Sequence, residues 1–295
     1  MTSQNNLISI GMPVYNGERF IRQAINSLLS QNYNNLELII SDNASEDLTE
    51  KICKNYAKND RRIRYYRNEK NLGSAWNFKR VLNLASGEYF MWAAHDDVWH
   101  PNFILFCIKM LETNKGAEMA FCNIVNIDSF GRVIRTYPSF EKFSGKSSLK
   151  NIINYAKDSE KMGKANLVYS IYKTSFCKKL WDTYLQGYEW GSDMCFVLAA
   201  LSRSKICIDN RVLFQKRIVR DSDQENFASE MIVKNPKRHI FPLEKSFEYI
   251  KNNLRAVKNT KYYYIVLIVM IYRLPRVFWN FFLNKLNGLK YRIKK

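Results

Sequence analysis

Two adjacent carboxylates, Asp96 and Asp97, directly follow a strongly apolar segment, residues 88–94. Adjacent carboxylates at the mouth of a buried strand are costly unless a cation neutralises them. Their hard oxygen atoms suit Mg²⁺ or Mn²⁺, and such ions also bridge phosphate oxygens. A solvated acidic turn is the alternative, but the apolar segment before the pair and Trp99 and Pro101 after it favour a metal site.

Three further side chains stand where an apolar segment ends or begins. Tyr15 offers a ring that could stack on a nucleic base, or it is a surface tyrosine at a turn. Asp42 can accept a hydrogen bond from a base N–H, although by itself an Asx turn explains it as well. Asp193 begins an apolar helix and could act as a general base. Taken alone, favourable electrostatics at a helix N-terminus also explain that acid.

Alternating strands and helices must position these side chains. Apolar pairs at 20/21, 24/25 and 28/29 recur every four residues and predict a helix over residues 18–31. Ser45 is expected to cap the next helix. The alternation predicts an α/β fold with a mostly parallel sheet, flanked by helices, that binds ligands beyond the carboxyl ends of its strands. The expected strands are 7–14, 36–40, 63–66, 88–94 and 119–127, and further helices cover 75–84, 102–112, part of 182–201 and the region from 244 onward.

Several kinds of site are absent from the sequence. The first strand ends in residues 13–17 (PVYNG), which form neither a G-x-G-x-x-G dinucleotide motif nor a phosphate loop. None of the six cysteines forms a C-x-x-C pair, so we expect buried free thiols. Three scattered histidines do not make a metal cage. A chain of 295 residues with 46% apolar content predicts a packed core in one large domain or two small ones.

Several motifs, in the same order along the chain, resemble family 2 glycosyltransferases with a GT-A fold. The resemblance covers roughly residues 7–222 and is specific because many features agree in sequence order. The features are the opening strand and turn 9–17 (SIGMPVYNG), the helix 21–31, the second strand 37–45 (ELIISDNAS), the helix entry 71–77 (NLGSAWN), and His95-Asp96-Asp97 with Trp99 and Pro101.

The resemblance implies transfer of a sugar from a nucleoside diphosphate donor, generally with inversion. Pro13, Tyr15 and Asp42 would then frame the base, usually uracil. Asp96 and Asp97 would hold the ribose and a divalent ion, Mg²⁺ or Mn²⁺, on the diphosphate. The ion would act as a Lewis acid that stabilises the departing diphosphate.

The same resemblance implies a general base, and the chain departs from the family in two places. Asp193 would take the proton of the acceptor hydroxyl. The family often has an acid where this chain has Ala94, so either acid of the pair could be the direct metal ligand. Residues 216–220 follow an Arg-x-His pattern only loosely, and Arg217 or Arg220 would contact the diphosphate. A processive Gln-x-x-Arg-Trp motif is absent, which favours addition of a single hexosyl or N-acetylhexosaminyl unit to a glycan or lipid-linked acceptor.

Basic charge is concentrated in the last third of the chain. The net charge is +19, of which residues 1–200 carry +5 and residues 201–295 carry +14. Residues 262–295 combine apolar and aromatic side chains with lysines and arginines, which is typical of a helix lying in a membrane interface. Packing against the core with a solvated basic end is the alternative. We therefore expect a glycosyltransferase domain over 1–225 and a helical, basic-aromatic extension over 240–295 that contacts an anionic membrane surface from the cytoplasmic side.

The remaining expectations concern targeting and partners. The N-terminus lacks the pattern of a signal peptide, and no apolar run reaches the about 18 residues of a membrane-spanning helix. Nucleic acid is disfavoured because no binding motif is recognised and acidic strand ends repel phosphate unless a metal is bound. The acid missing at Ala94 leaves a non-catalytic protein that binds nucleotide sugars or glycans at a membrane as the alternative. The sequence predicts neither the sugar nor an oligomeric state.

Overall fold

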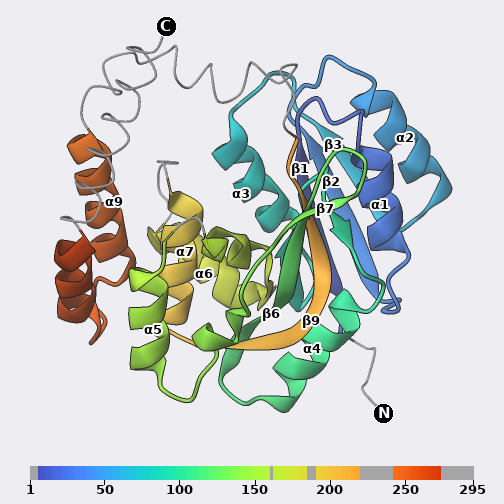
Figure 1. Cartoon of the computed structure of the whole chain (residues 1–295). Coiled ribbons are helices and arrows are strands. Elements are labelled where there is room, and N and C mark those ends of the chain that lie inside the picture. Colours follow the sequence, from blue (N-terminus) through green and yellow to red (C-terminus); the bar gives the residue numbers. More distant parts are fainter. Residues whose placement is uncertain (1–5, 160–161, 185–190, 220–241, 274–295) are drawn as a thin grey trace, which may run out of the picture.

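The computed structural model describes residues 6–159, 162–184, 191–219 and 242–273. Within these residues, nine strands form one sheet in the order β3-β2-β1-β4-β8-β6-β9-β5, with β7 paired to β6. Helices lie on both sides of the sheet, and the C-terminal helices stand outside them (Figure 1). The architecture confirms the predicted α/β class.

The first half of the sheet is parallel, as the alternation predicts. Its β1, β2 and β4 are buried along their whole length, and strands covered on both faces contain long apolar runs. The connections to β2 and β3 move in one direction along the sheet and the connection to β4 returns, so right-handed crossovers place α3 on the face opposite α1 and α2 (Figure 1). The elements are β1 (Ile8–Val14), α1 (Ile21–Leu29), β2 (Leu36–Asp42), α2 (Thr49–Asn59), β3 (Ile63–Arg67), α3 (Ser74–Leu84) and β4 (Tyr89–Trp92).

The second half of the sheet is mixed. Strand β8 lies antiparallel between β4 and β6, whereas β6 and β9 run parallel and β5 closes the edge antiparallel to β9. Strands β5, β8 and β9 are not among the predicted strands, because two of them are very short and β9 carries charged residues on a half-exposed surface. The strands are β5 (Val98–Trp99), β6 (Ala117–Ile127), β7 (Val133–Thr136), β8 (Ile171–Lys173) and β9 (Lys205–Arg217).

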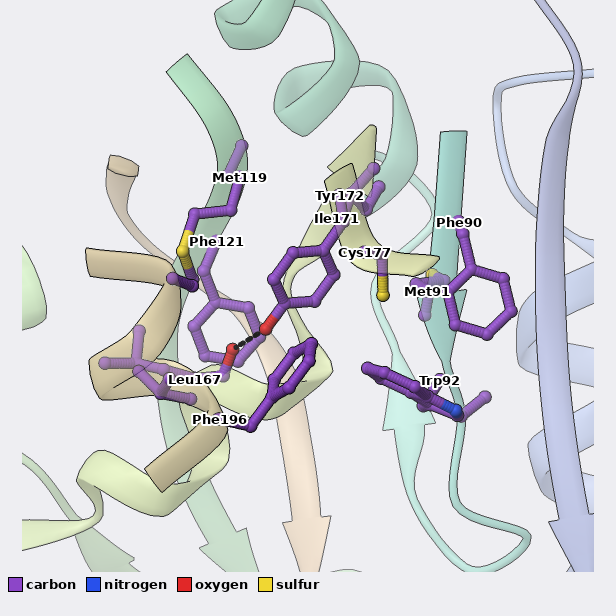
Figure 2. Close-up of a cluster of buried hydrophobic side chains, with 14 of the residues drawn as sticks. Phe90, Met91, Trp92, Met119, Phe121, Leu167, Ile171, Tyr172, Cys177 and Phe196 are labelled. Atoms are coloured by element: carbon purple, nitrogen blue, oxygen red, sulfur yellow. Dashed lines mark hydrogen bonds between the residues drawn. The ribbon is translucent and has the colours of Figure 1, made fainter. Parts of the chain in front are cut away.

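An aromatic cluster joins the centre of the sheet to the helices that cover it (Figure 2). The ring of Trp92 on β4 lies 4.9 Å from that of Phe90 and 5.4 Å from that of Phe196, both edge-on. The hydroxyl of Tyr172 on β8 donates a hydrogen bond of 3.0 Å to the carbonyl of Leu167. Edge-on rings of this kind contribute about 0.5–1.5 kcal/mol each beyond their buried area. The cluster therefore fixes the helix that carries Phe196 against the middle of the sheet.

A helical layer completes the molecule on the side of residues 140–201. Helix α7 contacts α5 and α6 on one side and α9 on the other. Residues 263–273 are also helical, so the helical region expected from residue 244 onward is confirmed as far as residue 273. None of the described helices is long and apolar enough to cross a membrane. The helices are α4 (Phe103–Thr113), α5 (Ser148–Lys157), α6 (Thr174–Tyr184), α7 (Ser192–Leu201) and α9 (Pro242–Ala256), with 3-10 turns at Phe140–Phe143 and Lys164–Tyr169.

The helix cap predicted at Ser45 is wrong. Helix α2 begins at Thr49, and it is Asp47 whose carboxylate accepts a 2.9 Å hydrogen bond from the Thr49 amide. The hydroxyl of Ser45 instead accepts a hydrogen bond of 2.9 Å from the amide of Asn16, in the loop after β1. Ala44 adopts a left-handed backbone with φ of 65°, which turns the chain before the helix can start. Ser45 thus connects two loops at the carboxyl edge of the sheet.

Candidate active site

The side chains predicted to frame a base meet at the ends of β1 and β2, where Val14 pairs with Asp42. Pro13 is buried in β1, whereas Tyr15 is exposed directly after it. Asp42 is fully buried, and one of its oxygens accepts from the amide of Ser45 at 2.8 Å. The other accepts from the hydroxyl of Tyr65 at 2.7 Å and lies 3.3 Å from the guanidinium of Arg67. The carboxylate is therefore held in one orientation, and its contact with a base stays a prediction.

A network of asparagines shapes the loop next to Asp42. The side-chain oxygen of Asn43 accepts from Asn68 at 2.8 Å and from the amide of Leu72 at 3.0 Å. Its amide nitrogen donates to the side-chain oxygen of Asn71 at 2.6 Å. Within the described structure the side-chain oxygen of Asn68 is buried without a hydrogen-bond partner. The backbone amide of Asn68 donates a hydrogen bond to the carbonyl of Asp42. The unpaired acceptor of Asn68 therefore lies close to the site predicted for the nucleic base.

The two acids of the predicted metal site differ in their surroundings. Asp97 is fully buried, and its Oδ1 accepts a hydrogen bond of 2.8 Å from the amide of Arg217. Its Oδ2 has no hydrogen-bond partner among the described residues and lies 3.7 Å from Nζ of Lys216. Burial raises the pKa of Asp97 to about 7, although Lys216 acts in the opposite direction. Asp96 is only half-buried, so of the pair it is the more accessible oxygen ligand.

Arg217 ties the acidic turn to the rest of the site. Its side chain is 3% exposed and donates to the carbonyl of Asp96 at 2.9 Å, the carbonyl of Asp128 at 2.7 Å and the side chain of Gln23 at 2.7 Å. The guanidinium carbon also lies 4.5 Å from the centre of the Phe20 ring. These contacts give Arg217 a positioning role, and the diphosphate contact expected for it stays a prediction. Arg220, expected to share that contact, lies outside the described residues.

A cavity of about 140 Å³ is lined by the predicted general base, Asp193, and by Lys216. A water molecule takes about 30 Å³ in the liquid, so the cavity has room for roughly five waters. Asp193 lies in the first turn of α7, and its Oδ1 accepts from the amide of Met194 at 2.8 Å. Burial raises the pKa of Asp193. The lining residues are Phe78, Trp92, Ala165, Asn166, Val168, Tyr169, Trp181, Ser192, Asp193, Phe196 and Lys216.

Lys216 is the cation that connects this cavity to the acidic turn. It lines the cavity together with Asp193, and its Nζ lies 3.7 Å from Asp97 and 4.8 Å from the centre of the Tyr169 ring. Interactions with Asp97 and Tyr169 raise its pKa against the effect of burial, so it stays charged. The structure therefore brings the acidic turn and Asp193 into one site with a partly buried positive charge between them. Trp92 and Phe196, whose rings line the cavity, also belong to the buried aromatic cluster (Figure 2).

The donor set at the acidic turn fits a hard divalent cation. The buried Oδ2 of Asp97 lacks a hydrogen-bond partner within the described residues, and Asp96 adds a partly exposed carboxylate beside it. Among the described residues no group of three or more His, Cys, Asp or Glu side chains could hold a metal by itself. Mg²⁺ is commonly bound through one or two carboxylates plus substrate phosphates and water, so two acids suffice for a site that the donor completes.

Sequence reasoning missed Lys216, Tyr169 and Asn68. Lys216 lies at the end of β9, which was not recognised as a strand, so its place in the sheet could not be predicted. Tyr169 ends a short 3-10 turn and Asn68 lies in the loop after β3, and neither segment has a periodic pattern. The signal that could have found Lys216 is its place next to Arg217, in the segment already singled out for its basic pattern.

Comparisons with known sequences identify relatives of the first part of the chain. A family model described as Glycosyl transferase family 2 matches residues 9–181. A protein of Rickettsia typhi named an uncharacterized glycosyltransferase is 38% identical over 123 residues, which are 41% of this chain and 37% of that protein. Another, from Methanocaldococcus jannaschii, is 29% identical over 140 residues, 46% of this chain and 48% of that protein. The chain thus spans less than half the length of these curated relatives.

Solved structures share the fold over most of the chain. The structure of S. aureus TarS 1-349 in complex with UDP matches with a TM-score of 0.66 at 17% identity. The match covers 92% of this chain and 71% of the TarS chain. PcManGT, a mannosyltransferase from Pyrobaculum calidifontis, was solved in complex with GDP-Man and Mn2+. It matches with a TM-score of 0.53 at 14% identity, and the match covers 88% of this chain and 68% of the PcManGT chain. At these identities the likeness shows the fold, which is the GT-A fold, with a curled central sheet flanked by helices.

Proposed function

Because the chain belongs to glycosyl transferase family 2, we propose that it transfers a single sugar from a nucleoside diphosphate sugar to a hydroxyl of a glycan or lipid-linked acceptor. The observation that carries the proposal is the cavity in which Asp193 and Lys216 lie beside the acidic turn Asp96-Asp97. In this proposal the donor is a UDP-sugar, with a hexosyl or N-acetylhexosaminyl unit. TarS, which shares the fold, is solved with UDP-GlcNAc.

Asp193 is the general base of the proposed reaction. Its carboxylate would remove the proton of the acceptor hydroxyl while the oxygen attacks the anomeric carbon from the face opposite the departing diphosphate, which inverts the configuration. Burial raises its pKa, and a stronger base accepts a proton more readily at neutral pH. The hydrogen bond that the Met194 amide donates to Oδ1 of Asp193 orients the carboxylate in the cavity.

The donor is held by the loops at the carboxyl edge of the sheet. Tyr15, Pro13 and Asp42 would frame the base, and Asp96 with Oδ2 of Asp97 would hold Mg²⁺ or Mn²⁺. When bound, the ion would supply Lewis-acid stabilisation of the departing diphosphate. Arg217 would hold both acids close to β9, because its backbone amide donates to Oδ1 of Asp97 and its guanidinium donates to the carbonyl of Asp96.

The test is turnover of a panel of nucleotide sugars by the purified full chain with Mn²⁺, read as release of the nucleoside diphosphate. Asp193→Asn should lower the turnover by about 10²–10⁴-fold, the usual contribution of a general base. Asp182→Asn is the matched control, because that carboxylate is 68% exposed and pairs with Lys79 at the surface. Full turnover by Asp193→Asn would overturn the assignment.

A non-catalytic nucleotide-sugar or glycan-binding protein is the second candidate, and the replacement of the family's third acid by Ala94 favours it. It predicts that UDP or a UDP-sugar with Mn²⁺ raises the melting temperature of the wild-type chain while no donor is turned over. Binding without turnover, in the presence of glycan and lipid-linked acceptors, would select this candidate over the enzyme.

A further inference from the structure

The helix at residues 263–273 uses one face to pack on the molecule. Tyr262, Val266 and Met270 are buried and belong to the hydrophobic core. The guanidinium of Arg273 donates a hydrogen bond of 2.9 Å to the carbonyl of Ala156, at the end of α5. Residues four apart share one face of a helix, so these contacts fix which face points inward. The helix is therefore a docked part of the fold.

The opposite face of this helix is apolar and exposed. Tyr264 is 74% exposed, Ile268 65%, Ile271 54% and Tyr272 78%. Their spacing of three and four residues places them on one stripe, which we call the Tyr264–Tyr272 face. Contiguous apolar patches on a soluble surface mark contacts with proteins, ligands or membranes. The helix stands at the outside of the helical layer, on the far side of α5 and α7 from the sheet (Figure 1).

The surrounding chain has the charge that an anionic surface attracts. Residues 249–295 contain eleven lysines and arginines and no aspartate or glutamate. The 22 residues that follow the helix add Phe278, Trp279, Phe281 and Phe282 to six of these basic residues. Aromatic and aliphatic side chains with clustered cations are the composition of helices that lie in a lipid headgroup layer. A protein partner would need the same apolar and acidic surface, whereas an anionic bilayer provides both without further fitting.

We propose that the Tyr264–Tyr272 face docks on an anionic lipid bilayer. Ile268 and Ile271 would enter the acyl boundary, with Tyr264 and Tyr272 at the headgroup level and the flanking cations against lipid phosphates. Helix α9, which precedes this helix, contacts the start of α7, where the predicted general base Asp193 lies. The hydroxyl of Tyr249 on α9 is 3.9 Å from Sδ of Met194, and its ring packs against Gly191. The bilayer would thus lie on the same side of the molecule as the start of α7. This surface assignment does not depend on the proposed sugar transfer.

The test is co-sedimentation of the purified full chain with sucrose-loaded vesicles, either of phosphatidylcholine alone or with 30% phosphatidylserine. We expect binding to the anionic vesicles that weakens as salt is raised. Ile268→Glu with Ile271→Glu should weaken that binding at least tenfold, because each change places a carboxylate against anionic lipid. Val133→Glu with Ile134→Glu is the matched control: it adds the same charge at two exposed apolar residues of β7 and should bind like the wild type.

Three results would overturn the proposal. The first is absence of wild-type binding to the anionic vesicles. The second is equal binding by wild type and Ile268→Glu/Ile271→Glu, which would mean that residues 274–295 bind without this face or cover it. The third is a wild-type dimer in solution that the same variant dissociates, which would assign the face to a second copy. Tyr264→Ser with Tyr272→Ser repeats the test without added charge, and unchanged melting temperatures show that both variants are folded.

Discussion

Replacing Arg217 by methionine separates a positioning role from a diphosphate contact. The change removes three hydrogen bonds and leaves the carbonyl of Asp96 without its donor, whereas the carbonyl of Asp128 still accepts from the amide of Gly131 at 3.1 Å. A buried acceptor without a partner costs about 1–3 kcal/mol. Burial lowers the pKa of Arg217, which shows that its charge is itself costly to bury, and methionine recovers part of that cost. We expect a net loss of about 1–3 kcal/mol in the free energy of unfolding.

Chemical denaturation of both proteins measures this loss, and isothermal titration with UDP and Mn²⁺ measures the nucleotide affinity. The matched control is Arg211→Met, since Arg211 lies on the same strand and its side chain is 56% exposed, while its partner Asp209 is 12% exposed. An ion pair with an exposed member contributes about 0–1 kcal/mol, so this variant should lose less stability than Arg217→Met. If Arg217→Met unfolds with a free energy within 1 kcal/mol of the wild type and yet loses UDP affinity, the positioning argument is refuted and the diphosphate contact is correct.

Three further predictions test other parts of the structure. Although burial favours the protonated form of Glu37, hydrogen bonds from Ser86, Ser9 and Arg64 lower its pKa. Its stabilising effect is therefore present above the unfolded pKa of about 4.3 and lost as the pH falls through the lower folded pKa. The stability difference between wild type and Glu37→Gln should shrink from pH 7 to pH 3, and a constant difference would contradict this. Gly17→Ala should weaken Mn²⁺ binding measured by calorimetry, because its Cβ would lie 2.8 Å from the His95 ring beside the acidic turn; unchanged affinity would count against it. A thiol reagent should label Cys207 first in the native protein, since the other five cysteines are buried, and rapid labelling of several would show a looser core.

The regular part of the fold follows from the sequence because its strands are buried on both faces. The runs at β1, β2 and β4 are apolar enough to be recognised alone, and the helices between them carry one apolar stripe each. Strands β8 and β5 are three and two residues long, and tertiary pairing rather than local pattern makes them strands. The start of α2 was misplaced because Ser45 serves a neighbouring loop instead of its own helix.

The candidate site was predictable where its residues follow a strand and not where they come from distant segments. Asp42, Asp96 and Asp97 lie at strand ends, where the carboxyl-edge rule points. Nothing local indicates that Asp97 would be enclosed while Asp96 stays half-exposed, since that difference arises from the amide of Arg217 and the charge of Lys216 on β9. The basic pattern of residues 216–220 marks that segment as a candidate, but it does not indicate which acid the segment contacts.

The bonds of Arg217 also constrain the order in which the protein is made. They join residues 120 apart at Asp97 and 194 apart at Gln23. A growing chain exposes the first four strands early, and they can begin to pair while synthesis continues. The acidic turn, however, cannot receive its hydrogen bonds from Arg217 until β9 has left the ribosome. A chain released before residue 217 would therefore carry a nearly complete parallel half-sheet whose two acids lack their hydrogen bonds from Arg217.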